Sequence, residues 1–223
     1  MPARRPLRLV LAPALIGIWL VLAGPAPASA AGGYSRDVYF AAAYERQVDG
    51  RTCTAASTAM MMNMLDRHDL NLPQMSILRF EQVRDALMDA RQRGSDPLGW
   101  SRAATYYSRY TWRPTVYRWE AYPTRTAALK RAATEIAATG KPVGLVIRHG
   151  QHAVVMTGIQ TGSNPLKGRD FALVSIAISD PLGVTHRWYT ASSYPLDTYR
   201  ELDATAAFDK AWYGKYVIIV PQG

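Results

Sequence analysis

Residues Val143–Gln160 read VGLVIRHGQHAVVMTGIQ, and this stretch decides the fold class. Two short runs rich in β-branched and apolar residues, Val143–Arg148 and His152–Gln160, flank a turn that contains a glycine. Short runs of this kind, bounded by turn residues, are typical of β-strands. Three later runs have the same character: Phe171–Ser179, Val184–Thr190 and Tyr216–Val220. The second half of the chain therefore predicts an antiparallel sheet.

The first half of the chain has the period of helices instead. Cys53–Leu65 is rich in Ala and Met, and Ser76–Arg93 places its apolar residues on one helical stripe. A third helix is expected after Asp96-Pro97 and a fourth over Thr124–Thr139. Helices followed by strands indicate an α+β domain, with an N-terminal helical layer packed on the antiparallel sheet.

The N-terminus has the three parts of a secretory signal peptide. Three arginines (Arg4, Arg5 and Arg8) precede the apolar run Leu9–Ala23, and a small-residue site ends at Ala30. The run is shorter than the roughly 20 apolar residues that a membrane-spanning helix needs. We therefore expect cleavage after Ala30, a secreted protein and no integral membrane segment in the mature chain.

Residues 31–223 form one expected domain, because no repeat, linker or low-complexity tract interrupts them. The signal peptide holds three of the 26 basic residues and none of the 17 acidic ones, so its loss lowers the net charge from +9 to +6. This mild excess is spread along the chain, which argues against a nucleic-acid partner. An anionic cell wall remains a candidate surface, and a monomer is expected.

Cys53 is the only cysteine of the chain, so no disulfide within the chain can form. An unpaired thiol in a secreted protein is either reactive or buried as a small hydrophobic residue. Cys53 opens a predicted helix, and the positive end of a helix dipole favours the thiolate that a nucleophile requires. Gln47 lies six residues upstream, where its amide could donate to an oxyanion beside the thiol.

A nucleophilic thiol needs a base, and four histidines are available: His68, His149, His152 and His186. His152 opens an apolar strand, which would hold a base on a rigid element. The strands that begin at His152 and end at Ser179 read as a hairpin centred near Leu166, which would set Asp180 opposite His152 on the same face. Asp180-Pro181 is also an ordinary sequence for a turn at the end of a strand.

Order and spacing together resemble the papain-like cysteine peptidases of the bacteriocin-processing, double-glycine type and their secreted relatives. The resemblance covers about Arg46 to Val220. It rests on Gln47, on Cys53 at a helix start, on Gly140–Val143, on His152–Gly158 and on Asp180-Pro181.

The resemblance implies a papain-like fold and a peptide or protein substrate. It implies that Cys53 is the nucleophile, His152 the general base and acid, Asp180 the group that orients His152, and Gln47 the oxyanion donor. Thr54 departs from the pattern, because many relatives have Gly after the nucleophile, and this puts access to the site in question.

Other functions stay open at this stage. The same Cys, His and Asp order serves transglutaminase-like acyl transfer, and a papain-like domain that lost its activity would be a binding module. His149 and His152 form a His-x-x-His pair, but positions three apart on a strand project to opposite faces and no further ligand motif accompanies them. We therefore expect neither a metal nor a cofactor.

Overall fold

The computed structural model describes residues 33–85, 94–168, 170–200 and 211–223. The predicted signal peptide, and residues 86–93 of the predicted helix Ser76–Arg93, lie outside the described residues. Within the described residues, no helix is long and apolar enough to cross a membrane.

The α-helices of the described residues agree with the sequence prediction in number and order. They are α1 (Cys53–Asp66), α2 (Gln74–Gln82), α3 (Pro97–Tyr107) and α4 (Arg125–Thr139), with short 3-10 turns η1 (Ala41–Ala43), η2 (Ser108–Tyr110) and η3 (Arg148–Gly150). Only α2 departs clearly from its predicted bounds. It begins two residues earlier than predicted, at Gln74, and it ends at Gln82.

Local side chains explain where two of these helices begin. The Asp96 carboxylate accepts the amides of Leu98 and Gly99, both at 2.8 Å, and so caps α3 with Pro97 as its first residue. The Thr124 hydroxyl caps α4 in the same way, and Gly140 ends α4 with a left-handed φ of 62°.

Seven strands among the described residues form one antiparallel sheet. They are β1 (Tyr34–Asp37), β2 (Tyr117–Tyr122), β3 (Val143–Ile147), β4 (His152–Thr161), β5 (Leu173–Asp180), β6 (Val184–Thr190) and β7 (Tyr216–Pro221). The order is β2-β7-β3-β4-β5-β6. β3 pairs with the first half of β4, and β1 pairs with the second half. The α+β class with an antiparallel sheet is therefore confirmed.

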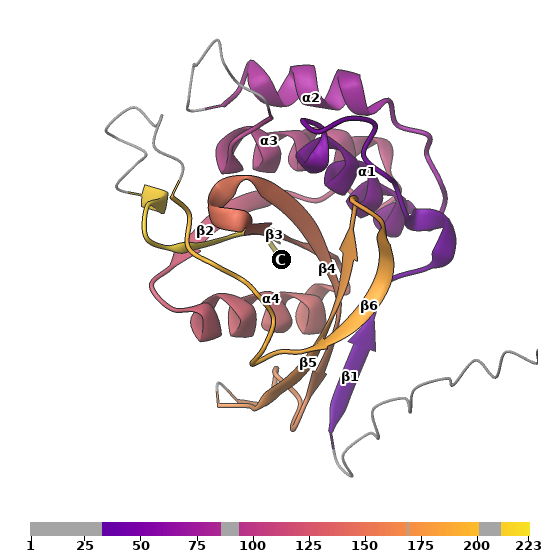
Figure 1. Cartoon of the computed structure of the whole chain (residues 1–223). Coiled ribbons are helices and arrows are strands. Elements are labelled where there is room, and N and C mark those ends of the chain that lie inside the picture. The colour runs from indigo at the N-terminus through magenta and orange to yellow at the C-terminus, as the bar shows by residue number, and fades with distance from the viewer. Residues whose placement is uncertain (1–32, 86–93, 169, 201–210) are drawn as a thin grey trace, which may run out of the picture.

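Helices cover both faces of this sheet (Figure 1). α4 packs with Leu145, Val154, Met156 and their neighbours in one core, whereas α1 and α3 pack with Val146, Ala153, Val155 and theirs in another. The prediction of a single helical layer was wrong in this respect, because α4 lies across the sheet from the N-terminal helices. Every residue from Cys53 to Leu65 is buried, so α1 is enclosed on all sides.

Candidate active site

Cys53 is the first residue of α1 and is 9% exposed. Burial raises the pKa of its thiol to about 11, and the carboxyl of Glu81 acts in the same direction. The backbone amide of Ala153 is the main hydrogen-bond partner that opposes this shift, joined by the amides of Thr54 and of Cys53 itself. In the resting protein, Cys53 is therefore a thiol close to several backbone N–H groups.

The start of α1 is attached to the start of β4 through Ala153. Its amide hydrogen-bonds the Cys53 sulfur, and its carbonyl accepts the Ser57 hydroxyl at 3.3 Å, one helical turn further along. Because Ala153 directly follows His152, the fold brings Cys53 to the neighbouring residue of the predicted base.

His152 is the first residue of β4 and is 4% exposed. Its Nε2 lies 2.7 Å from Oδ1 of Asp180, which also accepts the Leu182 amide at 2.8 Å. Burial alone would raise the pKa of Asp180, but the hydrogen bonds from His152 and Leu182 outweigh it and lower this pKa. A carboxylate at Nε2 favours the tautomer that is protonated there, which leaves Nδ1 as the basic nitrogen.

Cys53 and His152 reach this region from different faces of the sheet. Ala153 and Val155 face α1, while Val154 and Met156 face α4, and strand alternation assigns the first residue, His152, to the α4 side. Any contact between the Cys53 sulfur and the His152 imidazole would therefore have to pass around the end of the sheet, where β4 begins.

The hairpin that carries His152 and Asp180 is present with a shifted register. Val155 pairs with Ser179, so the next residue, Asp180, lies opposite Val154 rather than opposite His152. The two irregularities in the pairing shift the register by one residue in opposite directions and cancel, so the offset arises because the hairpin is centred at Lys167 rather than Leu166. Since the offset is two residues, both side chains stay on one face, and the diagonal pair still forms a 2.7 Å contact.

Gln47 belongs to the loop before Cys53 and lies beside the residue that follows Asp180. Its backbone N–H donates to the Pro181 carbonyl at 3.1 Å, and its side-chain Nε2 donates to the Asp49 carbonyl at 2.7 Å. Its Oε1 is buried without a hydrogen-bond partner. A primary amide has two N–H bonds, so one of them remains after the bond to Asp49.

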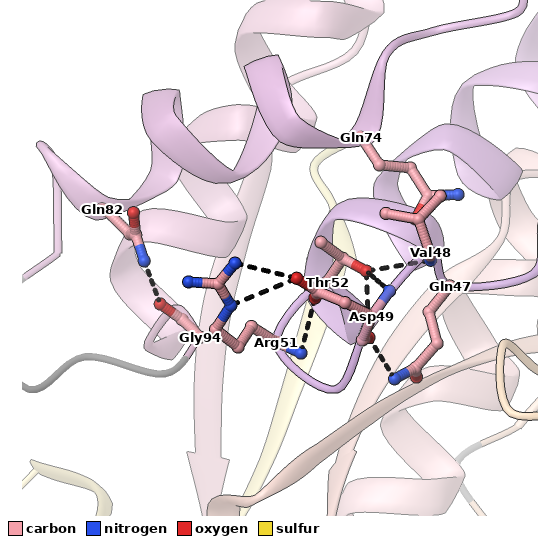
Figure 2. A network of polar contacts seen from close by, with 8 residues as sticks. All are labelled: Gln47, Val48, Asp49, Arg51, Thr52, Gln74, Gln82 and Gly94. Carbon is pink, nitrogen blue, oxygen red and sulfur yellow. Dashed lines mark hydrogen bonds and ion pairs between the residues drawn. The ribbon is translucent and has the colours of Figure 1, made fainter.

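Side chains hold the loop that leads to Cys53 in one conformation (Figure 2). The Thr52 hydroxyl accepts the amides of Val48 and Asp49 at 3.1 and 3.2 Å. The Gln74 side chain, at the start of α2, accepts the Val48 amide at 3.1 Å and donates to the Arg46 carbonyl at 2.8 Å. These bonds fix the backbone on both sides of Gln47.

The Thr54 side chain is directed into the protein rather than over the thiol. It is 5% exposed, and its hydroxyl donates to Oε2 of Glu81 at 2.7 Å, while the Thr58 hydroxyl donates to the other oxygen at 3.3 Å. Burial raises the pKa of Glu81 to about 8. The bulk that Thr54 adds is therefore taken up against α2.

The residues considered for metal binding do not converge. His149 Nδ1 lies 3.1 Å from the Thr198 carbonyl, whereas His152 is paired with Asp180. The described part of the chain has no group of three or more His, Cys, Asp or Glu side chains that could hold a metal ion.

No protein-family model matches the chain, and no curated protein matches it. Among solved structures, the chain is similar to the crystal structure of UfSP from C. elegans, with 13% sequence identity and a TM-score of 0.46. The match covers 80% of this chain and 32% of that one, so the chain spans about a third of its length. A likeness at this level assigns neither fold nor activity.

Proposed function

We propose that the chain is a cysteine peptidase of papain-like organisation, with Cys53 as nucleophile and His152 as base. One observation carries the proposal: α1 presents Cys53 at the amide of Ala153, directly after a histidine whose Nε2 is held by Asp180. A nucleophile, a base and a group that orients the base are the parts that acyl transfer through a thiol requires.

The reaction would proceed in two halves. His152 Nδ1 takes the thiol proton as Cys53 Sγ bonds to the substrate carbonyl carbon, and the imidazolium then protonates the amine as the C–N bond breaks. In the second half, His152 removes a proton from water, the hydroxide displaces Sγ from the acyl group, and the thiol is restored. The Cys53 amide and the free N–H of Gln47 would hold the oxyanion.

The raised pKa of Cys53 makes His152 indispensable in this scheme. A thiol with a pKa of about 11 is almost entirely protonated at pH 7. Reaction at neutral pH therefore needs transfer of the proton to His152, either before the attack or during it. Without this transfer, Cys53 would be a buried structural thiol and the domain a binding module.

The test is the rate of iodoacetamide alkylation of Cys53 in the folded protein between pH 5 and 11. We expect wild type to react well below pH 8, and we expect His152→Ala to lose this reactivity and keep only a limb near pH 11. His186→Ala is the matched control, because His186 lies 3.0 Å from a different carboxylate, that of Asp37. It should leave the profile unchanged.

Two results would refute the proposal. One is a single limb at high pH in wild type, which would show that the thiol has no basic partner. The other is a low-pH limb that survives in His152→Ala, which would show that another group activates the thiol.

A further inference from the structure

A hollow between α2 and α3 is lined by three arginines and two aromatic rings. Its volume is about 340 Å³, and its lining residues are Phe80, Arg84, Arg102, Thr105, Tyr106 and Arg109. This is within the range of about 300–1,000 Å³ that small-molecule sites occupy. The residues assigned to the peptidase reaction do not line it.

Among the described residues, no carboxylate forms an ion pair with the positive groups of this hollow. None of the three guanidinium groups forms an ion pair with any described residue, whereas Arg51 and Arg131 do so elsewhere. Three cations of one sign around one concavity raise the local concentration of anions.

Two of the guanidinium groups are held in place before any ligand arrives. Arg84 lies 3.5 Å from the centre of the Phe80 ring and donates to the Phe80 carbonyl at 3.2 Å. Arg102 donates to the Arg84 carbonyl at 3.0 Å. Each bond uses one of the five N–H groups of a guanidinium, so most donors stay available.

The rings form a rigid wall beside these donors. Phe80 and Tyr106 stack with ring centres 4.3 Å apart, and the Tyr106 hydroxyl is 3.0 Å from that of Tyr110. The Arg109 guanidinium lies over the Tyr106 ring, 6.0 Å from its centre. An apolar wall next to fixed donors suits a ligand with a charged group and an attached apolar part.

We propose that this hollow is a binding site for a phosphate group. A carboxylate has one charge and two oxygens, which a single guanidinium fork can satisfy. A phosphomonoester has up to two charges and three free oxygens, so it can engage several guanidinium groups at once. A soluble phosphomonoester and a lipid with a terminal phosphomonoester, such as phosphatidic acid, present this same group.

The experiment follows the arginine Nε–Hε and backbone amide resonances of ¹⁵N-labelled protein during titration with inorganic phosphate at low salt. The test variant is Arg102→Gln with Arg109→Gln. The control is Arg79→Gln with Arg118→Gln, which removes the same charge from exposed positions of α2 and β2. Circular dichroism checks that both variants are folded.

We expect saturable binding in wild type that weakens by about tenfold or more in the test variant, since a hydrogen bond to a charged group contributes about that factor. The control should change by less than twofold. Vesicles containing phosphatidic acid distinguish the two sources: binding that the test variant loses identifies a lipid headgroup, and no binding identifies a soluble ester. Both results are consistent with the phosphate site.

Three results would overturn the proposal. Absence of saturable phosphate binding would show that the hollow is not a site. An equal loss in the control would show a diffuse charge effect. Glutarate that binds as tightly as phosphate would show a preference for carboxylates.

Discussion

Glu81 is a buried carboxyl group that contacts α1, the helix that begins at Cys53, and it makes the stability of this region depend on pH. Its pKa is raised from 4.5 in the unfolded chain to about 8 in the folded protein, because burial disfavours the charged form. Between these values the unfolded chain releases a proton that the folded protein keeps. The stability that protonated Glu81 contributes is therefore fully present below pH 4.5 and is lost as the pH rises towards 8.

We expect the free energy of unfolding to fall from pH 5 to pH 8, and Glu81→Gln to make this fall shallower by up to about 1.4 kcal/mol per pH unit. Asp85, whose pKa burial also raises to about 8, would account for a remaining slope. Urea unfolding at four pH values measures the slope of the free energy of unfolding against pH. Asp170→Asn, at an exposed position, is the control. An unchanged slope in Glu81→Gln would mean that Glu81 is ionised in the folded protein.

At the residue scale, the sequence singled out the candidate site residues but not the buried groups that pack around them. Cys53, His152, Asp180 and Gln47 were named because a rare residue type, a helix start and a strand start single them out, and their roles stay predictions. Glu81 was missed, because an acid within an amphipathic helix reads as a surface residue. Only the hydroxyls of Thr54 and Thr58, which face it across the helix contact, reveal why it is buried.

The turn η3 joins β3 to β4 and is held in a strained conformation just before His152. Arg148 and His149 both have positive φ, 52° and 59°, in the left-handed region that non-glycine residues rarely adopt. The segment after β6 holds them there: Asp197 Oδ1 accepts the His149 amide at 3.1 Å, and the Arg200 amide donates to the His149 carbonyl at 2.9 Å.

Asp197→Ala should lower the free energy of unfolding by about 1 kcal/mol, because it removes one acceptor that holds this turn. We also expect the His152-dependent limb of Cys53 alkylation to decrease, since η3 sets where β4 begins. Asp170→Ala, which removes an exposed acid from a loop, should change neither quantity. A less stable Asp197→Ala variant with an intact low-pH limb would separate η3 from the placement of His152.

Elements were predictable where their period was strong. The runs of the second half became β3 to β7 with their ends within two residues, because alternating or β-branched segments between turns have few other solutions. Two strands were missed, β1 and β2. Tyr117–Tyr122 reads as part of an aromatic-rich stretch, and its strand exists because β7 supplies a partner from almost a hundred residues away.

On the scale of the whole molecule, one sheet serves two cores. The α4 core contains Ile136, and the α1 core contains Met61, Trp100 and Trp212, all of them fully buried. Gly144 shows how tightly the second core meets the sheet, because a Cβ at this position would lie 2.5 Å from the Trp100 ring. The side of the sheet on which each helix packs was not evident from the sequence, since α4 is amphipathic and suits either face.

Because the strands between the cores are shared, loss of either core should unfold the whole domain. Ile136→Ala and Met61→Ala should each lower the free energy of unfolding by about 2–5 kcal/mol. Trp100 and Trp212 lie in the α1 core and Trp119 packs against it, so fluorescence is weighted towards this core although Trp112 and Trp188 also contribute. Far-ultraviolet circular dichroism reports every element. In Ile136→Ala, both signals should shift together to lower urea concentration. If the fluorescence transition stayed at its wild-type midpoint while the dichroism shifted, the two cores would unfold separately, and α4 would not contribute to holding β4 and His152 in place.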